Sequence, residues 1–248
     1  MNELIENGPK SMVIGILALQ GAFAEHQVML QKLGLQVEIC VNLVRSVQDL
    51  QTCDALVIPG GESTTIALLA KLSGLLDPLR EFLRTKPVWG SCAGAILMSR
   101  NVTNAKKGGQ DLLGGLSVTT TRNGWGSQIE SFEVPLVVQS LSQPDRPFQG
   151  VFIRAPVVFS VDLTPEDPPL QIIARVPVQL LPDAQHLVLQ NQNLADPLNP
   201  RTIVAFRQGN HLFTSFHPEL TKDDRFHTYF VQECVIPSLV TGRSSLIR

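Results

Sequence analysis

The sequence predicts a three-layer α/β protein with a mainly parallel central sheet, helices on both faces and a β-rich second half. Over the first half, short apolar runs alternate with stretches of helical spacing, which is typical of βαβ units. Strands that are apolar throughout fit a parallel sheet buried on both faces. Beyond about residue 115, closely spaced strand-like runs replace this alternation.

The first half gives its elements in order. An apolar strand over residues 13–19 ends at Gln20-Gly21, and apolar side chains then recur at helical spacing. Residues 63–65, Ser-Thr-Thr, can cap a helix after a Pro-Gly-Gly turn. The expected strands cover residues 13–19, 35–41, 54–58 and 87–89, and the expected helices cover residues 22–33, 63–72 and 78–83.

The second half contains mostly strand-like runs and one closing helix, expected over residues 222–236. Residues 162–200 contain seven of the 17 prolines, so we expect an insertion of strands and irregular loops there. The expected strands cover residues 116–121, 131–138, 151–153, 171–176, 186–189, 202–206 and 212–216.

Composition limits the classes of protein that fit. The 248 residues suit one large domain, which we expect over residues 13–240, between tails at 1–12 and 241–248. Charged residues make up 17% of the chain and the net charge is −2, so nucleic-acid binding is disfavoured. No apolar run approaches the roughly 18 to 20 residues that a membrane span needs.

Cysteine usage and the start of the chain indicate a cytoplasmic protein. The four cysteines are far apart and lack C-x-x-C spacing, which argues against a zinc site or a disulfide framework. Residues 1–12 lack the basic start and apolar core of a secretory signal. A reducing compartment fits both observations.

The segment Gly90-Ser91-Cys92-Ala93-Gly94 has the pattern of a nucleophile elbow. A sharp turn from strand to helix needs glycines around the central residue, because a Cβ would clash there. The turn lifts the Cys92 side chain clear of the sheet, and the helix N-terminus favours the thiolate form. Cys92 is therefore a candidate nucleophile.

His217-Pro218-Glu219 supplies the groups that such a nucleophile requires. A cysteine nucleophile needs a base and a third group that orients the base. His217 follows an apolar strand, and the carboxyl ends of parallel strands meet at the ligand-binding edge of a sheet. Glu219 lies two residues further on and can reach back to the imidazole.

A third segment can stabilise negative charge. Residues 59–63, Pro-Gly-Gly-Glu-Ser, follow a strand and open a helix, so their N–H groups and that of Ala93 could form an oxyanion hole. Loss of one such donor typically costs about 3 to 4 kcal/mol of transition-state stabilisation.

Each motif also has an ordinary structural interpretation. A lone cysteine before a helix is often a small buried hydrophobe, His-Pro-Glu is often a capped loop, and Gly-Gly is often only a turn. Their joint occurrence at predicted strand ends favours catalysis. We expect the other histidines to be solvated on helix surfaces or loops, and Arg122 and Arg154, on sequence alone, to be surface charges. These histidines are His26, His186, His211 and His227.

Six segments together resemble one known family. They are residues 17–21 (LALQG), 59–65 (PGGESTT), 90–94 (GSCAG), 122–123 (RN), 150–156 (GVFIRAP) and 215–221 (SFHPELT). From about residue 13 to 236 the chain resembles the glutaminase subunits of pyridoxal 5'-phosphate synthase (the PdxT/SNO family). These are class I (triad) glutamine amidotransferases, which have a flavodoxin-like fold.

The resemblance implies a Cys92–His217–Glu219 triad that hydrolyses L-glutamine to L-glutamate and ammonia through a glutamyl thioester. It implies an oxyanion hole formed by the N–H groups of Gly61 and Ala93. It also implies that Arg122 and Arg154 line the substrate site, where a guanidinium suits an amino-acid carboxylate. The implied glutamine-binding residues are Gly61, Glu62, Ser63, Arg122, Ile153 and Arg154.

The resemblance further implies a partner and no cofactor. A (β/α)8-barrel synthase subunit would take the ammonia for pyridoxal phosphate (vitamin B6) synthesis, and Gln20 with its neighbours would sense docking of that subunit. No metal or bound organic cofactor is implied. The chain departs from the family pattern in the length of 162–200, in Gly124-Trp125-Gly126 and at Ala95.

Two other functions remain open at this point. The chain could serve mainly as a binding and regulatory subunit with little catalysis, although the complete triad argues against this. It could also be a stand-alone cysteine hydrolase acting on γ-glutamyl peptides, which would be active without a partner.

Overall fold

In the computed structural model of the chain, the structure describes residues 11–104, 109–122, 124–125, 131–181 and 199–245. A seven-stranded sheet forms its centre, in the order β10-β11-β12-β4-β3-β1-β2. The five strands from β12 to β2 run parallel. At one edge, β11 pairs antiparallel with β12, and β10 pairs antiparallel with β11. The strands are β1 (Ser11–Leu17), β2 (Glu38–Val44), β3 (Ala55–Ile58), β4 (Val88–Ser91), β10 (Leu170–Arg175), β11 (Ile203–Gln208) and β12 (His211–Thr214).

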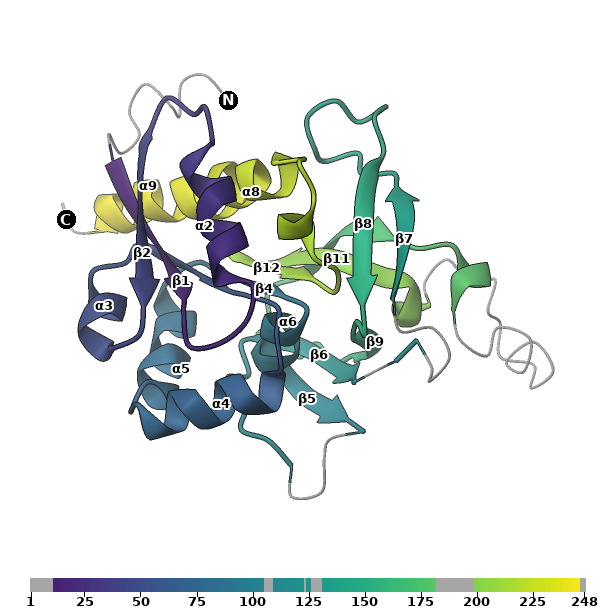
Figure 1. Cartoon of the computed structure of the whole chain (residues 1–248), viewed down its shortest axis with the longest axis horizontal. Helices are drawn as coiled ribbons and strands as arrows, with labels where there is room; N and C mark the ends of the chain where they lie inside the picture. The colour runs from purple at the N-terminus through teal and green to yellow at the C-terminus, as the bar shows by residue number, and fades with distance from the viewer. Residues whose placement is uncertain (1–10, 105–108, 123, 126–130, 182–198, 246–248) are drawn as a thin grey trace.

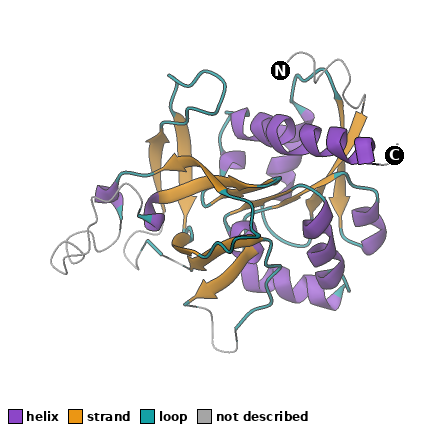
Figure 2. Ribbon diagram, turned by 180° about the vertical axis from the view of Figure 1, so that it is seen from behind, coloured by secondary structure: helices purple, strands orange, loops and turns teal. Residues whose placement is uncertain are grey.

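Helices cover both faces of this sheet (Figures 1 and 2). One face carries α2 (Phe23–Gln31) and the C-terminal helical segment. That segment consists of α8 (Arg225–Tyr229), a π-helical stretch (Phe230–Val235) and α9 (Ile236–Ser245). The other face carries α3 (Val47–Gln51), α4 (Ser63–Leu72), α5 (Leu76–Thr85) and α6 (Ala93–Met98).

Side-chain alternation along the central strands divides the hydrophobic core into two layers. In β3, Ala55 and Val57 join the core beneath α2 and α8, whereas Leu56 and Ile58 join the core beneath α4 and α5. All four are fully buried, because successive residues of a strand point to opposite faces and helices cover both. The apolar runs of the sequence reflect this two-sided burial.

Two smaller sheets extend the molecule beyond this centre. One contains β5 (Ser99–Thr103), β6 (Leu116–Thr121) and β9 (Val157–Val161), and the other contains β7 (Ser131–Leu136) and β8 (Phe148–Ile153). Phe152 of β8 packs against Phe216, with ring centroids 5.4 Å apart, and Phe148 packs against Phe226 at 4.8 Å. These aromatic contacts hold the segment that follows β12.

The sequence predicted the class and most elements correctly, but it missed several short ones. Strands β5 and β9 and helix α3 were not expected, because each has only five residues and mixes polar with apolar positions. Short 3-10 helices at Val178–Leu180, Pro200–Thr202 and Pro218–Leu220 were not expected either. The helix expected over 222–236 begins at Arg225 and continues as α9 to Ser245, beyond residue 240. The strand expected over 186–189 lies outside the described residues.

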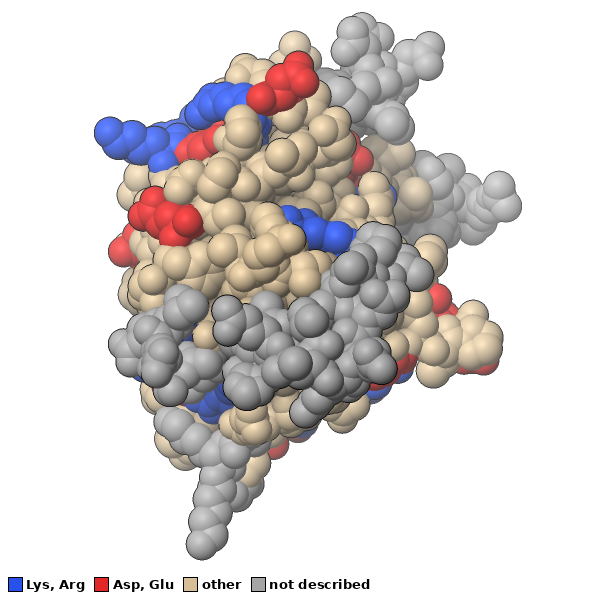
Figure 3. Space-filling model, turned by 90° about the vertical axis from the view of Figure 1, so that its right-hand side faces the viewer, with Lys and Arg blue, Asp and Glu red and all other residues tan. Residues whose placement is uncertain are grey.

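The described surface adds two findings. Seen from the side that carries β7 and β8, it is mostly uncharged, with Lys/Arg and Asp/Glu in small separate groups (Figure 3). None of the helices that the structure describes has both the length and the apolar character needed to cross a membrane.

Close packing of α6 on β3 gives a testable prediction. A Cβ at Gly94 would lie 1.9 Å from the carbonyl oxygen of Ile58, and relief of this clash would require the backbone of β3 or α6 to shift. We expect Gly94→Ala to lower the free energy of unfolding by about 1 to 3 kcal/mol, measured by urea denaturation. Gly34→Ala is the matched control, since nothing lies within 4 Å of its Cβ position. Equal stability of the two variants would contradict this packing.

Candidate active site

The candidate site lies where four neighbouring parallel strands end. Strands β12, β4, β3 and β1 are adjacent in the sheet, and the chain leaves them at the same edge. His217 follows β12, Cys92 follows β4, Gly60 follows β3 and Gln20 follows β1. The structure therefore brings together, at one rim, motifs that are spread over most of the chain.

Cys92 occupies a strained turn between β4 and α6. Its φ of 47° and ψ of −100° lie in a region that residues with a Cβ rarely adopt. Its N–H donates to the Thr214 carbonyl at 2.9 Å, and its own carbonyl accepts from the Ile96 N–H at 3.1 Å. A Cβ at Gly90 would overlap the backbone of α6, so glycine is required beside the turn. This is the elbow geometry that the sequence predicted.

His217 contacts Cys92 on one side and Glu219 on the other. Its Nδ1 lies 2.7 Å from Glu219 Oε1, and the neighbouring Cys92 thiol helps to raise its pKa. Its backbone N–H donates to the Val151 carbonyl of β8 at 2.8 Å. The ring also lies directly against Gly60, where a Cβ would come within 2.2 Å of Cε1. Glycine at this position therefore makes room for the imidazole.

The site is buried, and its charges stabilise one another. Burial alone would lower the pKa of His217, but hydrogen bonds with Cys92 and Glu219 outweigh burial and raise it to about 10. Burial alone would raise the pKa of Glu219, yet its interactions with His26 and His217 lower it. The preferred state is thus an ionised carboxylate beside a protonated imidazole.

Two further histidines, His26 and His227, lie behind Glu219. They were expected to be solvated, and the structure corrects this prediction. His26 and His227 are both fully buried, and His26 Nδ1 lies 3.0 Å from His227 Nε2. His26 Nε2 lies 3.4 Å from Glu219 Oε2, and Ser91 Oγ lies 3.3 Å from the same oxygen. Burial lowers the pKa of both His26 and His227, so both are neutral near pH 7.

The glycine loop after β3 is bonded to the loop after β1. The Gly60 carbonyl accepts from the Ala22 N–H at 3.0 Å, and Gln20 Oε1 accepts from the Glu62 N–H at 2.8 Å. Because the N–H of a trans peptide points opposite to its carbonyl, the Gly61 N–H is directed away from Ala22. The conformation of this loop therefore depends on the position of Gln20 and Ala22.

Arg122 belongs to a polar cluster rather than to the surface. Its side chain is only 9% exposed, and Nη2 donates to Glu62 Oε1 at 2.6 Å. Its Nη1 donates to Gln110 Oε1 at 3.1 Å, and that oxygen also accepts from Ser63 Oγ at 3.0 Å. Three residues expected from the family resemblance thus lie in one hydrogen-bonded group.

Ile153 and Arg154 approach the site from β8. The Ile153 carbonyl lies 3.9 Å from Cys92 Sγ, which places this strand end against the thiol. Arg154 is exposed, with a left-handed φ of 44°. The strand end therefore supplies both a backbone acceptor beside the sulfur and an exposed cation.

Sequence reasoning missed His26, Ser91, Gln110 and His227. A usable signal existed for the two histidines, since each shares a helix face with apolar residues. His26 is three residues after Phe23 and four before Leu30, and His227 is four residues before Val231. Polar residues on an apolar helix face are expected to be buried.

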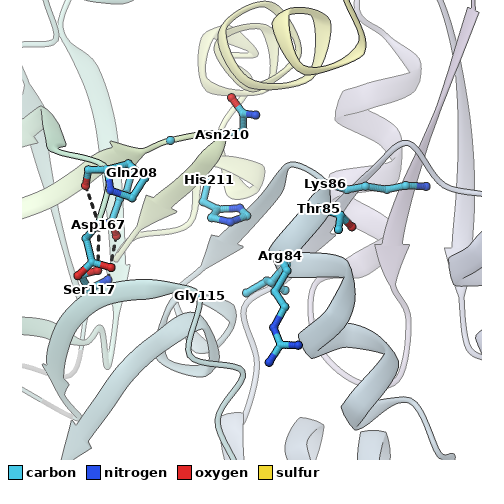
Figure 4. Close-up of a pocket in the computed structure, with 12 residues that line it drawn as sticks. Arg84, Thr85, Lys86, Gly115, Ser117, Asp167, Gln208, Asn210 and His211 are labelled. Carbon is cyan, nitrogen blue, oxygen red and sulfur yellow. Dashed lines mark hydrogen bonds between the residues drawn. The ribbon is translucent and has the colours of Figure 1, made fainter. Parts of the chain in front are cut away.

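A separate cavity lies at the opposite edge of the sheet (Figure 4). His211, at the start of β12, lines it together with Ser117, Asp167 and Gln208. These polar groups bond to one another or to the backbone, and burial lowers the pKa of His211 to about 4. Among the described residues, no group of three or more His, Cys, Asp or Glu side chains could hold a metal ion.

Comparison with a solved structure identifies the class of protein. The crystal structure of a glutamine amidotransferase matches this fold with a TM-score of 0.66 and 37% sequence identity. The match covers 88% of this chain and 97% of that chain. The fold is therefore that of a glutamine amidotransferase.

Sequence relationships define the family. The model of the SNO glutamine amidotransferase family matches residues 16–236, and the chain belongs to this family. "Probable pyridoxal 5'-phosphate synthase subunit PDX2" of Arabidopsis thaliana is 45% identical over 229 residues, covering 89% of this chain and 85% of its own length. Pyridoxal 5'-phosphate synthase subunit PdxT of Roseiflexus sp. (strain RS-1) is 43% identical over 223 residues, covering 89% and 99%. The family expected from the sequence motifs is confirmed.

The raised pKa of His217 gives a prediction for NMR titration. We expect its imidazole to titrate near pH 10, and Glu219→Gln to lower this midpoint because the carboxylate no longer stabilises the cation. Since the native state binds this proton more tightly than the unfolded chain does, the stability that His217 contributes is complete below about pH 6.5. It is lost as the pH rises towards 10. Glu38→Gln is the control for the titration, since Glu38 is an exposed residue of β2. An equal change of the His217 midpoint in both variants would contradict the role of Glu219 in raising this pKa.

Proposed function

We propose that the chain is the glutaminase subunit of a pyridoxal 5'-phosphate synthase, which hydrolyses L-glutamine and supplies the ammonia to a synthase subunit. Family membership and the names of the relatives support the overall reaction. One observation supports the residue roles: the end of β12 brings the His217 ring, with its Nδ1 2.7 Å from Glu219 Oε1, to the same side of Gly60 as Cys92 at the end of β4.

The proposed reaction begins at the thiol of Cys92. His217 already holds the proton given up by the thiol, in keeping with its raised pKa, and the sulfur attacks the carboxamide carbon of glutamine. The N–H groups of Gly61 and Ala93 stabilise the resulting oxyanion. His217 then protonates the departing nitrogen, so that ammonia leaves and a γ-glutamyl thioester remains on Cys92.

The second half of the reaction restores the enzyme. His217 takes a proton from water, the hydroxide adds to the thioester carbon, and the carbon–sulfur bond breaks to release glutamate. Glu219 remains ionised throughout and stabilises the imidazolium form of His217. Its lowered pKa supports this role, since a carboxylic acid could not stabilise the cation.

The polar cluster around Arg122 is the proposed binding site for the amino-acid end of glutamine. Glu62 carries a negative charge suited to the α-ammonium group, and Arg122 and exposed Arg154 suit the α-carboxylate. Gly61, Ser63 and Ile153 would complete the wall of the site. Arg122 is already oriented by Glu62 and Gln110, which limits the entropy lost on binding.

We further propose that the partner is a (β/α)8-barrel subunit and that the two proteins work in the cytoplasm. Ammonia in neutral water becomes ammonium and is no longer nucleophilic, so a shielded path to the partner is chemically required. Gln20 would sense docking, and its bond to the Glu62 N–H supports this coupling. Residues 13–240 would act as one domain, with residues 162–200 as an insertion.

Loss of the nucleophile tests the proposed reaction. We expect Cys92→Ala, assayed with the synthase partner present, to release no glutamate above background, because no thioester can form. Cys40→Ser is the control, since this exposed cysteine on β2 lies away from the site and should leave turnover unchanged. Undiminished turnover by Cys92→Ala would refute the proposal, and strong hydrolysis by the chain alone would favour a stand-alone hydrolase.

Substitution of Arg122 tests the binding site. We expect Arg122→Gln to raise the KM for glutamine by about 10- to 100-fold with a smaller effect on kcat, because a charge-assisted bond to the substrate is lost. Arg84→Gln is the control, since this exposed arginine pairs only at the surface with Glu81. A KM unchanged from that of the native chain would remove Arg122 from the site.

A further inference from the structure

The carboxylate of Glu219 has two oxygens in different surroundings. Oε1 faces His217, whereas Oε2 faces the interior of the protein, where the Glu219 side chain is fully buried. A buried carboxylate oxygen without water must find protein donors, or its charge is strongly destabilised. A group that donates a proton to Oε2 therefore also controls the orientation of Oε1.

Two side chains lie close enough to serve Oε2. Ser91 Oγ lies 3.3 Å away, but its single proton is shared with the Phe216 carbonyl at 3.4 Å. His26 Nε2 lies at 3.4 Å. This contact is longer than a formed hydrogen bond, and within the described part of the chain no other acceptor bonds to this nitrogen, so its proton is available to Oε2.

The proton positions on the two buried histidines follow from their surroundings. His26 is neutral because it is fully buried, and the nitrogen that faces a carboxylate must carry the proton, since a lone pair would be repelled. His26 Nδ1 is then an acceptor, and His227 Nε2, 3.0 Å away, must be the donor to it. Both rings are thus neutral Nε2–H tautomers that point their protons towards Glu219.

Packing holds both rings in this orientation. Trp89 contacts His26 edge-on at a centroid distance of 5.1 Å and His227 at 4.8 Å. Trp89 is itself fixed, because its Nε1–H donates to Thr214 Oγ1 at 3.0 Å in the neighbouring strand β12. The chain of contacts therefore runs from α8 through α2 to the acid beside His217.

We propose that His26 is a positioning residue for glutamine hydrolysis: oriented by His227, it presents Nε2–H to Glu219 Oε2 and thereby fixes the plane in which Oε1 meets His217. This role rests on the proposed function, because it requires Glu219 to orient the base. His26 touches neither substrate nor thiol. Its effect passes through Glu219 alone.

Two substitutions that differ in one donor test this role in the assembled complex. The amide nitrogen of Gln in His26→Gln can reach the place of Nε2, whereas the shorter amide of His26→Asn reaches only the place of Nδ1 and leaves Glu219 Oε2 with the shared proton of Ser91 alone. We expect His26→Asn to lower kcat by about 10- to 100-fold with an unchanged KM for glutamine. His26→Gln should recover most of the loss.

The controls separate positioning from folding and from the proposed reaction. His211→Asn makes the same chemical change at the first residue of β12, at the end of the strand away from the active site. This variant should leave kcat unchanged. Equal loss of activity in His26→Asn and His26→Gln, or native kcat in His26→Asn, would overturn the role of His26. Native kcat in His26→Asn alongside inactive Cys92→Ala would leave the proposed function intact and remove this inference alone.

A measurement on the unaltered chain covers the case in which a variant does not fold. Nitrogen-15 NMR of histidine side chains distinguishes the two neutral tautomers. At pH 7 we expect both His26 and His227 to carry the proton on Nε2. A proton on Nδ1 of His26 would overturn the proposal whatever the kinetics show, since Glu219 would then face a lone pair.

Discussion

The parallel pairing of β4 with β3 on one side and β12 on the other is the constraint on which the site depends. Ile58 lies opposite Gly90, and Thr214 opposite Ser91, so the loops after β3, β4 and β12 begin at the same level of the sheet. The turn after β4 then presents Cys92 between the loops that carry Gly60 and His217. A shift of one residue in either register would turn these side chains to the opposite face.

Burial gives His26, His217 and His227 opposite properties. Each loses hydration, which disfavours the charged form, yet only His217 has an ionised carboxylate and a thiol as direct partners. His26 and His227 contact each other and Trp89, and of the two only His26 approaches Glu219, at 3.4 Å. The contrast allows one imidazole to hold a proton while the two behind it remain neutral, so a single positive charge lies beside Glu219.

The sequence predicted the site residues that belong to short local motifs. It missed the site residues whose roles depend on contacts between distant segments. Cys92 lies between glycines, and His217 and Glu219 are two residues apart, so short-range pattern was sufficient. The role of Gly60 depends on a ring 2.2 Å from its Cβ position, and that ring comes from the far end of the chain. The helix pattern places His26 on an apolar face, but its contact with His227 depends on α8 lying beside α2, which no local pattern contains. Short strands such as β9 form only because β6 offers them a partner.

The separation of the site residues along the chain affects the newly synthesised protein. Ser91 and Glu219 make contact although they are 128 positions apart, and His217 is also tied to β8 by its backbone. A ribosome therefore releases the thiol long before it releases the imidazole, since synthesis proceeds from the N-terminus. Until β12 and the residues after it have emerged, the nascent chain carries Cys92 without His217 beside it. A product that stops short of β12 would thus lack both the imidazole and the carboxylate of the proposed triad.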